Sequence, residues 1–195
     1  MRRTGIIAAV VAVLTTLTMG VAQARPNNGI LVKPWTFALF TSVDDVESQW
    51  VTHEGLPDAG RSDHALYLQK FGPTADISAA GAEVDGVEGT QLVELGFDYR
   101  NDGHCGAGAP RFNVVTTDYV THFFGCVYGT HTPVNADWTR VRFSPADGLP
   151  PVVPGETVES VDIVFDEGTD VGQGFVYLDN IDYNGMIAGK PGLAR

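Results

Sequence analysis

Basic residues are scarce in this chain. Its 195 residues include 12 lysines and arginines against 24 aspartates and glutamates, which gives a formal net charge of −12 at pH 7. A surface with this charge repels the phosphates of nucleic acids and anionic membranes. We therefore expect neither nucleic acid nor a membrane as a partner. The same acidity is typical of a soluble extracellular surface, so it is not by itself evidence for a bound metal.

Long apolar runs are absent beyond the N-terminus, and the run at the N-terminus is typical of an export signal. Arg2 and Arg3 precede an apolar stretch over residues 6–17, and residues 22–24 (Ala-Gln-Ala) have the small side chains of a cleavage site. This stretch is shorter than the ~20 residues that a membrane-spanning helix needs. We predict a signal peptide over residues 1–24 and a secreted, extracellular protein without membrane insertion.

The sequence contains two cysteines, Cys105 and Cys126. Export to an oxidising compartment favours a disulfide between them. Closing a loop of about 20 residues would stabilise the fold by about 3 kcal/mol in the chain-entropy model. The alternative is a zinc site that adds His104 and His122 to the two cysteines. Zinc sites usually contain closer pairs such as Cys-x-x-Cys, so we predict the disulfide.

The motifs of known catalytic machinery are also missing. The sequence has no G-x-S-x-G, H-E-x-x-H or G-x-x-x-x-G-K segment. Ser62, Asp63 and His64 have the residue types of a catalytic triad, but immediate neighbours on a strand point to opposite faces. The five histidines show no metal-ligand spacing. We predict no catalytic residues, and an enzyme acting on glycans is the least favoured of the possible functions.

Helical periodicity is absent outside the signal peptide, whereas short strands bounded by turn residues recur. These strands are expected over residues 33–40, 65–71, 91–100, 111–117, 119–128, 138–143, 158–166 and 174–185. About eight strands of this kind are typical of a sandwich or barrel. We predict an all-β domain with little helix over residues 36–186. A polar leader at 25–35 precedes it, and a tail at 187–195 follows it.

The last expected strand, residues 174–185, has an aspartate inside an apolar run. Strict alternation would put Asp179 on the same face as Tyr177, Ile181 and Tyr183. Burying an unpaired charge is very costly. We therefore expect Asp179 to have hydrogen-bond donors, a cation or solvent around it.

Several segments occur in the order seen in a known group of proteins. The segments are Ser62-Asp63-His64-Ala65-Leu66-Tyr67-Leu68, Leu95-Gly96-Phe97-Asp98-Tyr99-Arg100, Asp137-Trp138-Thr139-Arg140-Val141, Val161-Asp162-Ile163-Val164-Phe165 and Tyr177-Leu178-Asp179-Asn180-Ile181. Over residues 36–185 the chain resembles the jelly-roll β-sandwiches of the galactose-binding-like superfamily, which includes many carbohydrate-binding modules. The resemblance implies a jelly-roll β-sandwich of two antiparallel sheets.

The same resemblance implies one cofactor, a structural calcium ion. In calcium-containing members, an aspartate of the last strand joins acidic and backbone groups near the N-terminus around Ca²⁺, which takes six to eight oxygen ligands. Asp179 matches that last-strand position, and Asp44 and Glu47 lie where the N-terminal ligands are expected. Their segment does not reproduce the usual N-terminal pattern. The alternative is that Asp179 accepts hydrogen bonds without a metal.

Sugar-binding members of the superfamily use either the concave sheet face or the loops at one end. Such sites combine an aromatic platform with a few polar groups. The polar candidates on the expected strands are Asp98, Arg100, Arg111, Asn113, His122, Arg140 and Arg142. If their strands are neighbours, these groups gather on one sheet. The alternative is that they form cross-strand ion pairs with Asp98 and Glu94.

Together these observations predict a secreted, monomeric, non-catalytic module that binds a carbohydrate or a cell-surface polymer. The alternative is an extracellular structural or interaction protein that keeps the jelly-roll fold without a sugar site.

Overall fold

The computed structural model describes residues 29–39, 45–58 and 62–191, so the predicted signal peptide and Asp44 lie outside the described residues. Within these residues, helix is limited to two single-turn 3-10 segments, η1 (Cys126–Tyr128) and η2 (Pro145–Asp147). The predicted all-β class with little helix is confirmed. Neither helix of the described part is long and apolar enough to cross a membrane.

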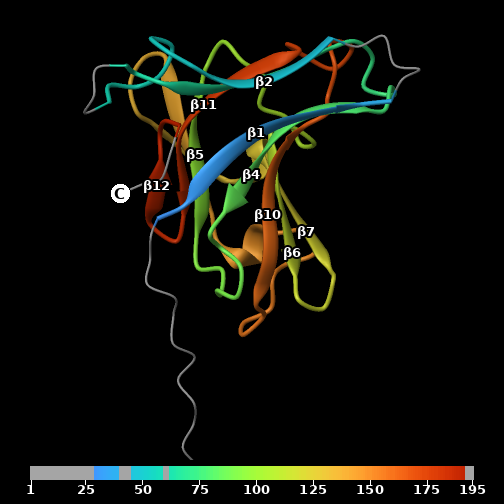
Figure 1. Ribbon diagram of the computed structural model, residues 1–195, viewed down its shortest axis with the longest axis vertical. Coiled ribbons are helices and arrows are strands. Elements are labelled where there is room, and N and C mark those ends of the chain that lie inside the picture. Colours follow the sequence, from blue (N-terminus) through green and yellow to red (C-terminus); the bar gives the residue numbers. More distant parts are fainter. Residues whose placement is uncertain (1–28, 40–44, 59–61, 192–195) are drawn as a thin grey trace, which may run out of the picture.

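One of the two sheets has five antiparallel strands. In spatial order they are β1 (Leu31–Ala38), β4 (Ser78–Asp85), β10 (Val158–Phe165), β6 (Arg111–Thr116) and β7 (Thr121–Gly125). Figure 1 shows β1, β4 and β10 lying side by side, with the β6–β7 hairpin next to them. The edge strands β1 and β7 are therefore separated by three strands.

The second sheet has seven antiparallel strands. In spatial order they are β2 (Asp45–Val51), β3 (Ala65–Phe71), β11 (Phe175–Tyr183), β5 (Leu95–Arg100), β9 (Trp138–Phe143) and β8 (Thr130–Pro133), while β12 (Met186–Ala188) pairs with the end of β11. The chain crosses repeatedly from one sheet to the other, for example between β4 and β5 and between β10 and β11. This two-sheet antiparallel arrangement confirms the predicted jelly-roll sandwich.

The core fills the space between the sheets and comes from alternate residues of their strands. In β9, Val141 and Phe143 face inward, as the alternation predicts. Phe97, Phe112 and Phe143 contact one another there, with ring centroids 5.4 Å to 6.2 Å apart. Such aromatic pairs contribute about 0.5–1.5 kcal/mol each beyond the area that they bury.

The predicted disulfide between Cys105 and Cys126 is confirmed. Cys105 lies in the loop after β5, and Cys126 directly follows β7. The bond therefore connects a loop that leaves the seven-stranded sheet with an edge strand of the five-stranded sheet. Because both cysteines are used, the alternative zinc site has no thiolate ligands.

A β-bulge interrupts β11 at its polar pair. Asp179 is opposite Asp98 on β5, and Asp182 is opposite Gly96, so three steps along β11 match two along β5. Asn180, inside this interval, has a φ of +45°, in the left-handed region that Asn tolerates better than most residues.

The bulge changes which residues of β11 face the core. Before it, Val176 and Leu178 point inward, and after it Ile181 and Tyr183 point inward. Asp179 lies on the outward face. The prediction that Ile181 and Tyr183 share a face with Asp179 is therefore wrong, because one extra residue shifts the alternation by one position.

The ends of the sandwich reach beyond the predicted boundaries. β1 begins at Leu31, inside the stretch predicted as a polar leader, and β12 runs to Ala188, inside the predicted tail. Both additions extend existing sheets: β1 pairs with β4 along its whole length, and β12 pairs with β11.

Candidate functional site

The seven polar residues predicted as ligand contacts are divided between the two sheets. The seven-stranded sheet carries Asp98, Arg100, Arg140 and Arg142, and the five-stranded sheet carries Arg111, Asn113 and His122. The set therefore does not gather on one face. The physical reason is the crossing of the chain after β5, which places β6 and β7 in the other sheet.

His122 is not available on an outward face. Its side chain is buried on the core side of β7, where Nδ1 lies 2.8 Å from the Pro150 carbonyl oxygen and Nε2 lies 3.1 Å from Thr116 Oγ1. Both ring nitrogens thus have partners inside the protein. This geometry is typical of a structural histidine.

Asp98 and Arg140 form a two-point ion pair across β5 and β9. Arg140 Nε and Nη2 donate to the two Asp98 carboxylate oxygens at 2.7 Å and 2.8 Å, and Asn180 Nδ2 donates to Asp98 at 2.9 Å. The Asp98 side chain is fully buried, so it depends on these donors. Arg142 makes single ion-pair contacts with Asp182 at 3.3 Å and with Glu94 at 3.6 Å. The cross-strand pairing considered as the alternative is present here.

Asp179 accepts hydrogen bonds from two backbone N–H groups, and no basic side chain among the described residues pairs with it. Its carboxylate oxygens accept the backbone N–H of Leu56 at 2.7 Å and of Asn180 at 2.6 Å. The side chain is 1% exposed. Burial is the main cause that raises the pKa of Asp179 to about 7; the neighbouring Asp58 and Asp98 contribute to this rise, and the two N–H groups oppose it. The residue fastens the loop after β2 onto β11.

The predicted calcium ligands are not brought together in the described residues. On β2, Glu47 is opposite Gln69 of β3, and Gln69 is in turn opposite Phe175 of β11. Phe175 lies four residues before Asp179 on that strand. Four residues of a strand span about 13 Å, too far for one ion to contact both carboxylates. No group of three or more acidic, histidine or cysteine side chains within the described residues could hold a metal. The calcium ion stays a prediction.

A tryptophan lies over the outward face of the five-stranded sheet. Trp35 in β1 is the register partner of Gly81 in β4. A Cβ added at position 81 would overlap Trp35 Cζ2, so glycine at this position makes room for the indole ring. Trp35 Nε1 donates to Asp162 Oδ1 at 2.9 Å. The ring therefore packs on Gly81 and is fixed at its indole nitrogen by Asp162.

Polar side chains continue across the sheet from this tryptophan. Asp162 in β10 is opposite Asn113 in β6, and Arg111 Nε donates to Asn113 Oδ1 at 2.8 Å. Arg111 also binds both carboxylate oxygens of Asp166, at 2.6 Å and 2.8 Å. Burial raises the pKa of Asp162, while its bond from Trp35 acts in the opposite direction.

A second aromatic ring lies at the other edge of this sheet. Phe123 in β7 is the register partner of Asn113 and is 40% exposed. Its ring centroid lies 5.7 Å from Arg111 Cζ, within the range of a cation–π contact. We call Trp35, Arg111, Asn113, Phe123 and Asp162 the Trp35 face. Its two rings stand on the edge strands of a five-stranded sheet, about 19 Å apart across the strands at ~4.8 Å per strand spacing.

Only part of the Trp35 face was predicted from sequence. Arg111 and Asn113 were among the predicted contacts, whereas Trp35, Phe123 and Asp162 were not selected. One signal was present: Asp162 is a polar residue inside an apolar run, as Asp179 is. The position of Trp35 depends on the pairing of β1 with β4, which the sequence does not show.

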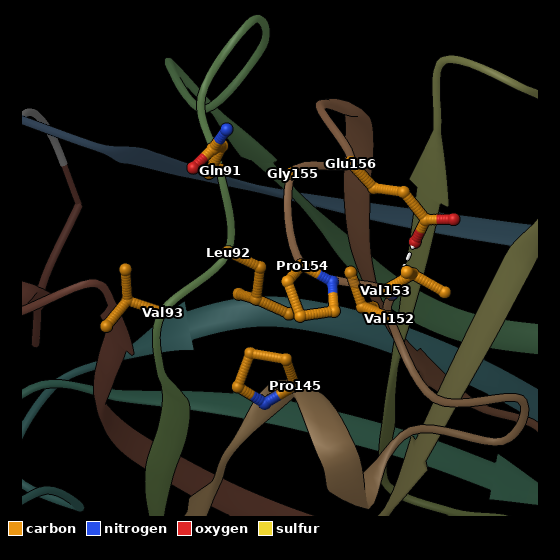
Figure 2. Close-up of a pocket in the computed structure, with 9 residues that line it drawn as sticks. All are labelled: Gln91, Leu92, Val93, Pro145, Val152, Val153, Pro154, Gly155 and Glu156. Carbon is orange, nitrogen blue, oxygen red and sulfur yellow. Dashed lines mark hydrogen bonds between the residues drawn. The ribbon is translucent and has the colours of Figure 1, made fainter.

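A pocket lies among loops of the sandwich. It is lined by Gln91, Leu92, Val93, Pro145, Val152, Val153, Pro154, Gly155 and Glu156. Figure 2 shows the Leu92 side chain and the rings of Pro145 and Pro154 close together around it. Its carboxylate, Glu156, accepts the backbone N–H of Val153 at 2.6 Å. These aliphatic and proline walls offer few groups for hydrogen bonding, and none of the predicted contacts is among them.

Comparisons with known proteins identify neither a family nor a ligand for this chain. No protein-family model matches the sequence, and no curated protein matches it. A solved structure that the chain resembles is the family 11 carbohydrate-binding module of the cellulosomal cellulase Lic26A-Cel5E of Clostridium thermocellum. The TM-score is 0.47 with 9% sequence identity over 78% of this chain and 86% of that chain. At this distance the likeness carries no argument about what this chain binds.

Proposed function

We propose that this protein is an exported, non-catalytic module that binds a carbohydrate on the Trp35 face. The observation that carries the proposal is the Trp35 ring, half-buried over Gly81 with its nitrogen bonded to Asp162. An aromatic ring fixed on the outside of a sheet has no role in the core. It offers a flat apolar surface whose orientation is already set before a ligand arrives.

The neighbouring groups fit the chemistry of a sugar. The apolar face of a sugar ring stacks on an indole, while its hydroxyls need donors and acceptors at the edge of that ring. Asp162 can accept from hydroxyls through the oxygen that Trp35 does not use. The Asn113 amide can donate, because its oxygen is already taken by Arg111. Both act as binding groups here, and the proposal gives neither a proton-transfer role.

The face is better suited to a polymer than to a single sugar. Trp35 and Phe123 stand on opposite edge strands, so a ligand that reaches both must cross the whole sheet. The outward residues of the strands between them include Gly81, Val164 and Asn113, so apolar and polar groups both lie along that path. The charge of the arginine on this face is balanced by Asp166. We therefore expect an uncharged polysaccharide.

The proposal is tested by native gel electrophoresis of the mature protein in gels that contain soluble β-glucan, xylan or galactomannan. We expect retardation by at least one of these polymers. Trp35→Ala should weaken the binding that depends on this face, whereas Tyr128→Ala, which removes an exposed ring from η1, should not. Absence of retardation by every polymer, followed by absence of binding to their oligosaccharides at millimolar concentration, would overturn the proposal. The alternative of an interaction protein without a sugar site would then stand.

A further inference from the structure

Three aromatic side chains contact one another on the outward face of the seven-stranded sheet. Tyr67 in β3 and Tyr177 in β11 are register partners, and their ring centroids lie 4.8 Å apart. The Phe175 ring is centred 6.0 Å from Tyr177 and 6.3 Å from Tyr67. All three are half-buried, whereas Val176 between two of them is fully buried in the core. Outward positions of an antiparallel sheet are normally polar, so this group indicates a contact surface.

Arg100 in β5 orients one of these rings without adding net positive charge. Its Cζ lies 3.6 Å from the centroid of the Tyr177 ring, a close cation–π contact. Its Nε donates to Asp102 at 2.8 Å, and its Nη1 donates to Glu54. The guanidinium therefore fixes the ring while two carboxylates balance its charge.

Amide, phenol and carboxylate groups border the rings. The Tyr67 hydroxyl donates to Gln69 Oε1 at 2.5 Å, and Gln69 Nε2 donates to Asp45 Oδ2 at 3.0 Å. Gln49, the register partner of Tyr67 on β2, donates to Glu47. Burial is the main cause that raises the pKa of Tyr67 to about 12, and the nearby acidic groups add to it. The phenol therefore stays protonated at neutral pH, with its hydrogen donated to Gln69 and its oxygen left to accept a hydrogen bond.

This combination of groups discriminates among ligand classes. The acidic border of Asp45 and Glu47 and the neutralised arginine disfavour phosphates, sulfates, uronic acids and acidic peptides. Rings flanked by amides and a phenol suit an uncharged ligand that carries many hydroxyl groups. We infer that Tyr67, Arg100, Phe175 and Tyr177, the Tyr67 face, form a second binding site for an uncharged polysaccharide. The inference rests on the proposed function, because it assigns the same ligand class to both faces.

The relative position of the two faces would allow the protein to link two polysaccharide chains. The Trp35 face and the Tyr67 face are the outward sides of two packed sheets, so they point away from each other. Sheets in a sandwich lie about 10 Å apart, and one straight polysaccharide chain cannot lie along both outward sides. A molecule with both faces occupied therefore connects two polysaccharide chains. In dense polymer, binding at one face holds neighbouring chains close to the other face. Dense polymer would therefore be bound more tightly than isolated chains.

The experiment combines retardation in native gels with turbidity of a polysaccharide solution. The probe is whichever of β-glucan, xylan or galactomannan retards the wild-type protein most. Wild-type protein should raise turbidity by linking chains. Trp35→Ala and Tyr177→Ala should each remain retarded but no longer raise turbidity, and the double variant should show neither effect. Thermal melts of all variants check that each is folded.

The possible outcomes separate the two proposals. Complete loss of retardation in folded Trp35→Ala, or turbidity that Tyr177→Ala leaves unchanged, would overturn the Tyr67 face and keep the proposed function. Unchanged retardation in Trp35→Ala with complete loss in Tyr177→Ala would overturn the proposed function and keep the Tyr67 face.

If Tyr177→Ala does not fold, Tyr67→Phe replaces it, because it keeps the ring and removes the hydroxyl. In a Trp35→Ala background, Tyr67→Phe should bind about tenfold more weakly, and unchanged affinity would contradict the inference.

Discussion

The Trp35 ring lies over Gly81 across the β1–β4 pair, in a space that any side chain at position 81 would fill. The added Cβ would also lie 2.5 Å from the Ile163 carbonyl oxygen on β10. The glycine thus allows both the close approach of a strand and the placement of a ring. One residue without a side chain determines the geometry of the proposed binding face.

Gly81→Ala should displace the tryptophan and strain the sheet. Overpacking of this kind costs about 1–3 kcal/mol, and the displaced ring should weaken polysaccharide binding as well. Urea unfolding and gel retardation measure the two effects. Glu83→Ala, an exposed outward position on the same strand, is the matched control and should change neither. Normal stability and normal binding in Gly81→Ala would contradict the assigned packing.

Arg140→Ala should destabilise the protein more than the loss of a surface ion pair does. Among the described residues it leaves the buried Asp98 carboxylate with the Asn180 amide as its remaining side-chain donor, and an unsatisfied buried group costs about 1–3 kcal/mol. Lys33→Ala removes exposed, solvent-screened contacts to Glu83 and Asp85 and should cost much less. Urea unfolding at pH 7 compares the two, and equal costs would argue against a structural role for the buried pair.

Asp179 should make the protein less stable as the pH rises from about 4 to 7. Its pKa in the folded state is raised to about 7 from an ordinary value of 3.8, so in this interval the folded protein holds a proton that the unfolded chain has lost. Stability from this group is therefore full below about pH 4 and lost by about pH 7, by an amount on the order of 2–4 kcal/mol.

The test is the free energy of unfolding of wild type and Asp179→Asn between pH 4 and pH 8. The variant cannot titrate at this position. The difference between its free energy of unfolding and that of the wild type should therefore increase up to about pH 7 and then stay constant. Parallel curves over the whole range would show that Asp179 does not titrate there. The same melts with EDTA test the predicted calcium ion, because a cation at Asp179 would keep it charged and a chelator would then lower the melting temperature.

Replacing both cysteines by serine should destabilise the fold by about 3 kcal/mol, as expected for a bond that joins residues 21 positions apart. Thermal melts of the oxidised, reduced and Cys105→Ser/Cys126→Ser proteins measure this. The reduced wild type and the double variant should melt at the same lower temperature. A double variant as stable as the oxidised protein would show that the bond adds no stability.

Strands with a clean alternation of inward and outward residues were predicted well from sequence. β9 occupies the predicted residues 138–143. β4 was missed because Ala79, Ala80, Gly81 and Ala82 have little strand propensity. It forms because β1 and β10 pair with it on both sides.

The candidate site was predicted less completely for two physical reasons. A bulge depends on one backbone conformation, here at Asn180, and alternation in the sequence carries no mark of it. Neighbours on a sheet also come from distant parts of the chain, as with Trp35 and Asp162, which are 127 residues apart. Residue types that can bind a sugar are visible in a sequence, but their grouping on one face is not.

The sequence by itself determined the all-β class, the pairing of the two cysteines and the acidic surface, because alternation, cysteine number and charge are local or additive properties. The tertiary structure alone decided which strands share a sheet. It thereby separated Arg100 from Arg111, buried Asp179 under the loop after β2, and placed aromatic rings on both outward faces. Those outcomes follow from strand order and register, which are set by long-range pairing across the sandwich.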